Sequence, residues 1–328
     1  MFLVAAVFAT FVALLTLVLL FMYWYMSLQE LKGVNRKSVF ITGCDTGFGN
    51  LLAKSLDRKG VRVFAGCLTE EGAAKLRSET SSRLLTVIVN ISPSRHHTTG
   101  SLTIHLLWTG LWGVVNNAGV MPTFAPVEWT TMEEFEQVFN VNFFGTIAVT
   151  KAFLPLLRQS SGRLVNVCSV TSNCGYPGIS SYVTSKSALK MFSVCLRREL
   201  LHSGVTVHTI EPGGFQTNIT DHHRMAGMVK KAYKRSSPEL QAVYGGHVCD
   251  YLLSGIKTAR DYCSSKPQYV ADAMTHALLS RMPKLRYLVG PDAHVFFRLL
   301  GYLPDRVVDY ILGWPALHGT ICSELEQE

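Results

Sequence analysis

The first 29 residues of this 328-residue chain contain no charged side chain. Val, Ala, Leu and Phe dominate the stretch, and about 20 consecutive apolar residues are enough to cross a bilayer. A cleaved secretion signal would need a charged start, a shorter apolar core and small residues at a cleavage site, and the stretch has none of these. It ends instead in the aromatic run 22–26, which is typical of a membrane–water interface. We therefore expect a retained transmembrane anchor over residues 1–29.

The chain also lacks the residue spacings of a metal site or a disulfide framework. Its eight cysteines include no Cys-x-x-Cys pair, and no His and Cys residues have the spacing that binds zinc. We therefore expect neither a bound metal nor disulfide bonds. Cys44, Cys67, Cys168 and Cys195 fall in predicted core elements, where free thiols act as small apolar side chains.

The net charge of +8 is not gathered into a basic stripe. Lysine and arginine are scattered, with one local cluster over residues 230–235. A solvated helix face, or a face near anionic lipid headgroups, explains that cluster more simply than a nucleic-acid site. We therefore expect membrane lipid, and no nucleic acid, among the partners. Lys32, Arg36 and Lys37 follow the anchor and no basic residue precedes it, which favours a cytoplasmic catalytic domain.

Apolar runs and helical stretches alternate along the rest of the chain. After a linker over residues 30–37 this alternation continues to residue 312, and a tail of residues 313–328 follows. It predicts a single Rossmann-like α/β domain over residues 38–312, a doubly wound parallel sheet with helices on both faces. The expected strands are Ser38–Thr42, Arg62–Cys67, Leu84–Asn90, Gly113–Asn116, Arg163–Cys168, Thr206–Glu211 and Arg286–Val289. The expected helices are Gly49–Lys59, Glu70–Thr80, Thr131–Gln159 and Ser180–Ser203.

Two local patterns refine this layout. Thr131 and Glu134 have the spacing of a capping box, which starts a helix. The crossover Ile91–Gly110, in contrast, combines weak periodicity with β-branched and helix-breaking residues. We therefore expect only a short or irregular helix there.

The glycine-rich turn Thr42–Gly49 lies between the first strand and the first helix, with the spacing Gly-x-x-x-Gly-x-Gly. Such a turn brings backbone N–H groups and a helix N-terminus close to a pyrophosphate, which side chains would otherwise block. On its own the turn is equally consistent with a structural role. A second motif downstream indicates a nicotinamide dinucleotide site.

That second motif is a tyrosine and a lysine four residues apart, Tyr182 and Lys186, on one face of a predicted helix. A phenol has a pKa of ~10, and a lysine ammonium about 4 Å away would lower it by ~3, which makes a usable general acid/base. The same spacing recurs at Tyr262 and Lys266, outside the strand–helix alternation. We interpret the second copy as a chance repeat.

Further motifs follow in order: Asn116–Gly119, Val141–Phe143, Ser169, and Pro212–Gly213 with Thr217. With the two motifs above, they resemble the short-chain dehydrogenase/reductase family over residues 38–312. Within that family the sequence is similar to the membrane-associated steroid, retinol and 3-hydroxybutyrate dehydrogenases. Its motif sequences most resemble those of the type-two branch of the 17β-hydroxysteroid dehydrogenases.

The resemblance implies a role for each matching residue. Tyr182 would be the general acid/base, Lys186 its electrostatic partner, and Ser169 a hydrogen-bond donor to the reacting oxygen, so that Ser169 and Tyr182 contact the substrate. Asn142 would anchor a water that relays protons to Lys186, and Thr217 would hold the carboxamide of the nicotinamide. The residues expected to bind the cofactor are Gly43, Asp45, Gly47, Phe48, Gly49, Asn90, Asn117, Ala118, Gly119, Tyr182, Lys186, Pro212, Gly213 and Thr217.

Local charge favours NAD over NADP. An NADP site needs Arg or Lys near the ribose 2′-phosphate. The turn carries Asp45 instead, and Glu70 and Glu71 follow the second strand, although that strand ends in Gly66–Cys67 rather than in an acidic residue. Asn90 stands where many relatives carry Asp beside the adenine. Because cellular NAD is mostly oxidised, we expect the enzyme to oxidise an alcohol.

The substrate is less closely defined. A membrane anchor suits a lipophilic alcohol, so a 17β-type hydroxysteroid is the first hypothesis, with retinol or 3-hydroxybutyrate as alternatives and a non-catalytic NAD-binding scaffold as a remote one. The substrate loop should follow Thr217 through Tyr251, and the apolar run Val295–Pro304 is either core or a surface that enters the bilayer. The resemblance also implies that the protein is located in the endoplasmic reticulum membrane and forms a homodimer or homotetramer.

Overall fold

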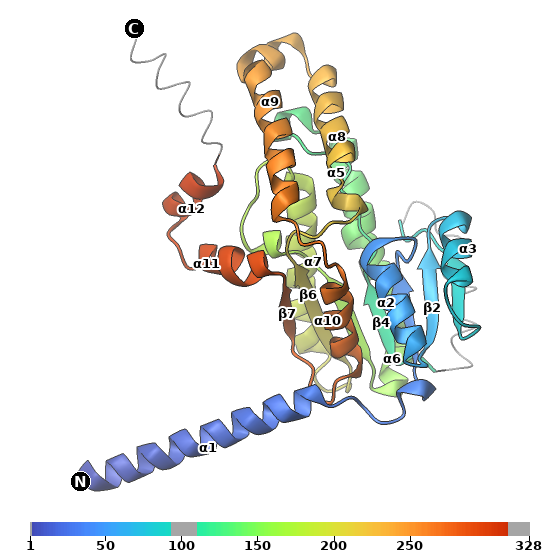
Figure 1. Ribbon diagram of the computed structural model, residues 1–328, viewed down its shortest axis with the longest axis vertical. Helices are drawn as coiled ribbons and strands as arrows, with labels where there is room; N and C mark the ends of the chain where they lie inside the picture. Colours follow the sequence, from blue (N-terminus) through green and yellow to red (C-terminus); the bar gives the residue numbers. More distant parts are fainter. Residues whose placement is uncertain (1, 93–109, 314–328) are drawn as a thin grey trace.

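Seven parallel strands form the centre of the protein in the order β3-β2-β1-β4-β5-β6-β7 (Figure 1). The computed structural model describes residues 2–92 and 110–313. The strands are β1 (Ser38–Thr42), β2 (Arg62–Cys67), β3 (Leu84–Ile88), β4 (Gly113–Asn116), β5 (Arg163–Val167), β6 (Thr206–Pro212) and β7 (Arg286–Val289). The strand order reverses between β1 and β4, which pair with each other directly. In open α/β sheets such a reversal leaves a crevice at the carboxyl ends of the strands, where ligands bind.

Helices cover both faces of the sheet, which confirms the predicted Rossmann-like fold. On one face α2 (Gly47–Arg58), α3 (Glu70–Ser78) and α10 (Gln268–Leu279) pack against alternate strand residues such as Val39 and Ile41. On the other face α6 (Thr146–Ser160) and α7 (Ser180–Glu199) pack against Phe40 and its counterparts. Because side chains of a strand alternate between faces, the continuously apolar strands supply both cores.

The long helix expected over Thr131–Gln159 is interrupted. The predicted capping box at Thr131 and Glu134 is present and opens α5 (Met132–Phe139). A π-helical turn, η4 (Asn140–Gly145), then separates α5 from α6. Such turns occur inside α-helices, often at functional sites, and this one contains Asn142.

Two helices replace the loop expected after Thr217. They are α8 (His222–Arg235) and α9 (Pro238–Tyr262), which form an antiparallel pair at the carboxyl end of the sheet (Figure 1). Val229, Val248 and Leu252 of this pair form a separate apolar cluster with Trp129. The expectation of a loop was therefore wrong. The apolar side chains of α8 and α9 pack against each other rather than against the sheet.

Some boundaries and burial predictions also differ. β3 ends at Ile88 rather than Asn90, β5 at Val167 rather than Cys168, and β6 continues to Pro212. Residues 93–109 of the crossover predicted to be irregular lie outside the described residues. Cys44, Cys67 and Cys168 are buried as predicted, but Cys195 is exposed. It lies four residues after Met191, which is 62% exposed, and this spacing places both on the face of α7 that points to solvent.

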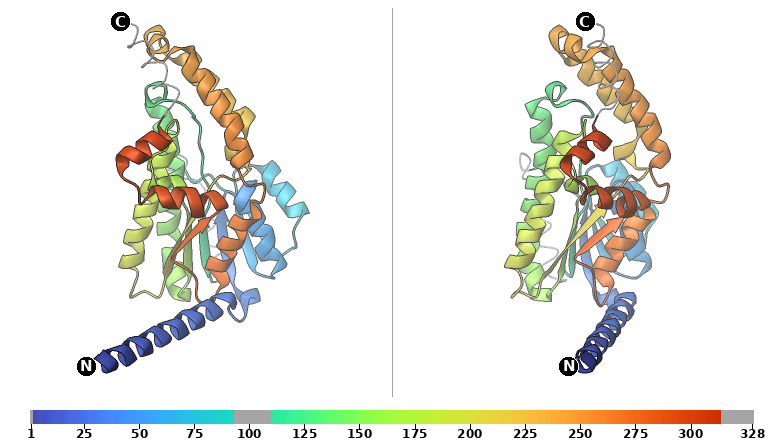
Figure 2. Two further views of the ribbon diagram at one scale, coloured as in Figure 1. Left: turned by 60° about the vertical axis from the view of Figure 1, so that its left-hand side comes forward. Right: turned by 90° about the vertical axis from the view of Figure 1, so that its left-hand side faces the viewer.

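The N-terminal helix α1 (Phe2–Leu28) extends away from the domain (Figures 1 and 2). Among the described residues, two helical segments are long and apolar enough to cross a membrane, Ala5–Leu28 and Met132–Ser160. The second is part of the domain core, with 44% of its most apolar window buried, whereas none of the corresponding window of the first is buried. α1 is therefore a candidate transmembrane helix.

Candidate active site

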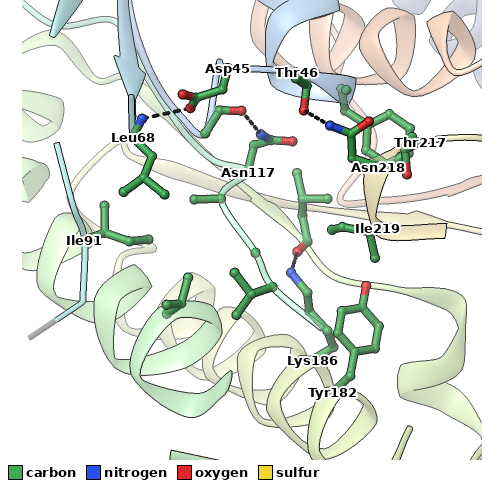
Figure 3. Close-up of a pocket in the computed structure, with 18 of the residues that line it drawn as sticks. Asp45, Thr46, Leu68, Ile91, Asn117, Tyr182, Lys186, Thr217, Asn218 and Ile219 are labelled. Atoms are coloured by element: carbon green, nitrogen blue, oxygen red, sulfur yellow. Dashed lines mark hydrogen bonds between the residues drawn. The ribbon is translucent and has the colours of Figure 1, made fainter. Parts of the chain in front are cut away.

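A cleft of about 1090 Å³ opens at the carboxyl ends of the strands, on both sides of the point where their order reverses. Nearly all the predicted site residues line it: Gly43, Asp45, Gly47, Phe48, Asn90, Asn117, Ala118, Gly119, Ser169, Tyr182, Lys186, Pro212, Gly213 and Thr217. Gly49 and Asn142 do not line the cleft and lie behind its wall. Figure 3 shows Asp45 and Thr46 at one end of the cleft and Tyr182 and Lys186 at the other. The fold thus brings the two predicted motifs together.

The glycine-rich turn is shaped for close approach by a ligand. Gly47, the first residue of α2, has a φ of +65°, a left-handed conformation that favours glycine. At Gly49 a Cβ atom would lie 2.5 Å from Asn117 Nδ2 and even closer to the Gly43 carbonyl oxygen. Asn117 Nδ2 donates to the carbonyl oxygens of Thr42 and Gly43 at 2.9 and 3.0 Å, which holds the turn against the end of β4. The N-terminus of α2 therefore faces the cleft without side chains in the way, as a pyrophosphate requires.

Asp45 holds the loop after β2 beside the cleft. Its carboxylate accepts hydrogen bonds from the backbone N–H groups of Leu68 and Thr69 at 2.8 and 2.9 Å, and from the Thr69 hydroxyl at 2.8 Å. The contact with Leu68 is visible in Figure 3. The negative charge thus stands next to the loop that would accompany the adenosine of a dinucleotide.

Tyr182 and Lys186 lie one turn apart on α7, as their spacing predicts. The Lys186 ammonium is 3% exposed, donates a hydrogen bond of 2.7 Å to the Val167 carbonyl oxygen, and lies 5.9 Å from the centre of the Tyr182 ring. Burial lowers the pKa of Lys186 to about 8. Burial also raises the pKa of Tyr182 to about 12, although a hydrogen bond with Ser169 opposes this.

The predicted decrease in the pKa of Tyr182 is therefore wrong. Burial removes the water that would solvate a phenolate, and this penalty exceeds the opposing effect of the Ser169 hydrogen bond. The ammonium in turn is directed at a backbone carbonyl oxygen rather than at the phenol oxygen. Both side chains are protonated at neutral pH.

Ser169 follows β5 and is 7% exposed. Its hydroxyl lies 2.9 Å from that of Thr171 and accepts a hydrogen bond from the Thr171 backbone N–H. The turn it begins, η5 (Val170–Asn173), ends at a buried carboxylate: Asn173 Nδ2 donates to Glu211 at 2.9 Å, and Arg286 binds Glu211 through two nitrogens at 2.6 and 2.7 Å. This network ties the serine turn to β6 and β7.

Asn142 lies in the π-helical turn and is fully buried. Its Oδ1 accepts from the Val120 N–H at 2.8 Å, and its Nδ2 donates to the Val120 carbonyl oxygen at 3.1 Å and to Ser185 Oγ at 3.0 Å. It therefore joins the strand end after β4 to α7, directly beside Lys186. An α-helical continuation would turn this side chain in another direction, so the π-helical turn decides its position.

Asn218 and Arg224 are among the cleft residues that were not predicted. Asn218 Nδ2 donates to the Thr46 hydroxyl at 3.2 Å, which connects the loop after β6 to the glycine-rich turn (Figure 3). Arg224, on α8, donates to the Asn218 carbonyl oxygen at 3.4 Å. Of the described residues that line the cleft, only Lys186 and Arg224 are basic. The local sequence around Asn218 and Arg224 contains no motif that indicates a site, and it predicts a loop there.

Two other kinds of site were considered, the second Tyr-x-x-x-Lys copy and a metal site. Tyr262 of the second Tyr-x-x-x-Lys copy is 79% exposed, and neither it nor Lys266 lines the cleft. Over residues 2–92 and 110–313, no group of three His, Cys, Asp or Glu side chains has the arrangement of a metal site.

The chain belongs to the short-chain dehydrogenase family, whose pattern matches residues 37–226. It is therefore an oxidoreductase that acts on CH–OH donors. Retinol dehydrogenase 7 of Mus musculus is 42% identical over 296 residues, which cover 88% of this chain and 92% of that protein. The 17-beta-hydroxysteroid dehydrogenase type 6 of Homo sapiens is 40% identical over 298 residues, covering 90% and 94%.

Solved structures agree on the fold. A short-chain dehydrogenase/reductase of Burkholderia phymatum, solved with NAD, superposes with a TM-score of 0.65 at 20% identity, covering 81% of this chain and 93% of that one. A relative from Burkholderia cenocepacia, solved with NADP, gives a TM-score of 0.63 at 20% identity, covering 85% and 98%.

Proposed function

We propose that this protein uses NAD to oxidise a secondary alcohol on a lipophilic substrate, a hydroxysteroid of the 17β type. One observation carries the proposal: Ser169, Tyr182 and Lys186 line the same cleft as the glycine-rich turn. Alcohol oxidation needs a proton acceptor next to a hydride acceptor. A non-catalytic scaffold would have no need for this intact set of three side chains.

The residues of the cleft fit a nicotinamide dinucleotide. The turn with Gly43, Gly47, Phe48 and Gly49 leaves room for the pyrophosphate, because the space beside Gly47, which lines the cleft, holds no other atom within 4 Å of a Cβ placed there. Asn90 would lie beside the adenine, and Pro212, Gly213 and Thr217 beside the nicotinamide, with Asn117, Ala118 and Gly119 along the floor. When bound, the nicotinamide supplies the hydride acceptor. Asp45 favours NAD, because its carboxylate repels a 2′-phosphate and holds a loop in which Leu68 and Thr69, not Arg or Lys, line the cleft.

The chain's own residues carry out the proton transfer. Tyr182 takes the hydroxyl proton of the alcohol, while Ser169 hydrogen-bonds the same oxygen and Thr171 orients Ser169. The charge of Lys186 stabilises the phenolate that must form first. The proton then leaves through Lys186 and a water held by Asn142, which also positions α7 through Ser185.

The relatives and the anchor together support the proposed substrate class. Proteins named for retinol and for 17β-hydroxysteroids are similar to this chain at about the same level, 42% and 40% identity. Both substrates are lipophilic alcohols that partition into membranes, as an anchored enzyme requires. Retinol is therefore the second candidate, and 3-hydroxybutyrate, which is water-soluble, the third.

Anchoring completes the proposal. We assign residues 1–29 to a membrane anchor, 30–37 to a linker, 38–312 to the catalytic domain and 313–328 to a tail. The exposed apolar helix α1 supports the anchor, and the basic residues after it support a cytoplasmic domain on the endoplasmic reticulum. A homodimer or homotetramer belongs to the same proposal.

The decisive experiment measures NAD reduction by membrane fractions that contain the chain, with estradiol, testosterone, retinol and 3-hydroxybutyrate as substrates. We expect turnover of a steroid, loss of turnover in Tyr182→Phe, and unchanged NAD binding in that variant. Tyr262→Phe is the matched control, because it changes the tyrosine of the same motif outside the cleft. An active Tyr182→Phe variant would refute the mechanism, and exclusive turnover of retinol would refute the steroid assignment.

A further inference from the structure

Exposed apolar side chains gather on the last described segment of the chain, outside α1. This segment comprises η7 (Ala293–Phe297), α11 (Arg298–Leu300) and α12 (Asp305–Leu312). Its exposed apolar residues, which we call the α11–α12 surface, are Val295, Phe296, Leu299, Tyr302, Leu303, Val307, Tyr310 and Ile311. Tyr302 and Tyr310 are 77% and 84% exposed. So many neighbouring apolar groups in water indicate a surface that is covered in the working protein.

The segment is anchored at its beginning and open at its end. Ala293 and Leu300 are buried against the domain, and η7 packs on β7 and on η5, the turn that begins at Ser169. No residue of α12 is buried. Val307, Tyr310 and Ile311 have the spacing of one helix face. α12 is thus an amphipathic helix whose apolar face has no partner within the described residues.

The α11–α12 surface lies on the side of the domain to which α1 points. In Figure 1 both project to the left, and in the right-hand view of Figure 2, where that side faces the viewer, both come forward. The direction of α1 is held by contacts at its end. The Ser27 carbonyl oxygen accepts from His276 Nε2 and Ser280 Oγ, each at 2.8 Å, and the Leu31 N–H donates to the Leu279 carbonyl oxygen at 2.7 Å.

We propose that the α11–α12 surface is embedded in the interfacial layer of the same bilayer that α1 spans. The inference rests on the anchor in the proposed function. A transmembrane α1 places the bilayer on the side of the domain to which it points, and that is the side carrying this surface. Exposed tyrosines and amphipathic helices are typical of the headgroup layer, where apolar side chains enter the acyl boundary.

The position of the surface suggests a use. It adjoins η5, so the layer from which a lipophilic alcohol would arrive lies one packed segment away from Ser169. A water-soluble hydroxy acid would gain nothing from this arrangement. The surface therefore favours a substrate that partitions into membranes over 3-hydroxybutyrate.

Fluorescence quenching by lipids tests the contact in the full chain. Tyr302→Cys and Tyr310→Cys would carry an NBD label in a background without the exposed Cys195 and without Cys322, in phosphatidylcholine vesicles with or without nitroxide-labelled lipids. Val243→Cys is the matched control, because Val243 is apolar and 75% exposed but belongs to α9, which lies away from α1 in Figure 1. A second control, Leu15→Cys, reports on α1.

We expect nitroxide lipids to quench positions 302, 310 and 15 but not 243. Quenching at position 15 alone would overturn the inference and leave the anchor intact, whereas no quenching at position 15 would overturn the anchor itself. Disulfide cross-linking between two Tyr310→Cys chains, without quenching there, would show that a second copy covers the surface. In a parallel assay, Val307→Asp with Tyr310→Asp should raise KM for a vesicle-borne alcohol several-fold without changing kcat; Val243→Asp should change neither.

Discussion

Tyr182 and Lys186 lie one turn apart on α7, and their pKa values together predict the pH dependence of the reaction. Burial holds the pKa of Tyr182 at about 12 and that of Lys186 at about 8, so the pair loses its first proton near pH 8. The phenolate–ammonium and phenol–amine forms contain the same number of protons and accumulate together as the pH rises. Because oxidation uses the phenolate, kcat/KM for the alcohol should rise about tenfold per pH unit and level off near pH 8.

Lys186→Met provides the control for this prediction. Without the ammonium, the rise should continue towards the high pKa of Tyr182, and the rate near neutral pH should fall by about 100-fold. Initial rates of NAD reduction over a range of pH check both variants. A wild-type profile that is flat through pH 8 would contradict this prediction.

At the scale of elements, α8 contributes a cation to the cofactor end of the cleft. Arg224 holds the Asn218 carbonyl oxygen, and Asn218 in turn holds Thr46 of the glycine-rich turn. A guanidinium that lines the cleft next to the glycine-rich turn would bind the pyrophosphate. Since hydrogen bonds to charged groups contribute about 1.5–3 kcal/mol, Arg224→Gln should weaken NAD binding at least about tenfold.

Two comparisons isolate this effect. Adenosine has no pyrophosphate, so its binding should not change in Arg224→Gln. Lys230→Gln removes a charge from an exposed position of the same helix that does not line the cleft, and it should leave NAD binding unchanged. Equal losses for NAD and adenosine, measured by titration calorimetry, would indicate a distorted loop instead of a lost phosphate contact.

The elements also show how far local sequence reaches. Four of the seven strands were predicted with the observed bounds and the other three with an error of one or two residues at one end, because uninterrupted apolar runs identify strands buried on both faces. The helix through Asn142 was predicted, but its π-helical turn was not, since one extra residue in a turn leaves the apolar periodicity almost unchanged. α8 and α9 were missed because their apolar faces pack on each other and on Trp129 rather than on the sheet.

At the scale of the whole molecule, a buried histidine makes the domain sensitive to acid. His208 in β6 is 1% exposed, and its ring nitrogens contact the Lys284 carbonyl oxygen at 2.7 Å and the Thr206 hydroxyl at 2.8 Å. Burial lowers its pKa from 6.5 to about 4. Its neutral form is therefore favoured by folding, and its contribution is complete above pH 6.5 and is lost as the pH falls towards 4.

This difference in pKa corresponds to about 3 kcal/mol of the free energy of unfolding. Thermal unfolding in detergent should show that the wild type loses more stability between pH 6.5 and pH 4 than His208→Gln does, since glutamine does not titrate. The exposed His202→Gln should behave like the wild type. Parallel losses in the wild type and His208→Gln would assign the acid sensitivity to other groups.

The sequence by itself determined the family, the order of the elements, the apolar helix α1 and a set of candidate site residues, nearly all of which line the cleft. These features depend on spacing along the chain: glycines in a turn, a tyrosine and a lysine one helical turn apart, and apolar runs of strand length. The tertiary structure alone decided the high pKa of Tyr182, the entry of Arg224 into the cleft and the shared side of α1 and the α11–α12 surface. Burial and contacts between distant segments set these properties, and the local spacing of residues predicts neither burial nor such contacts.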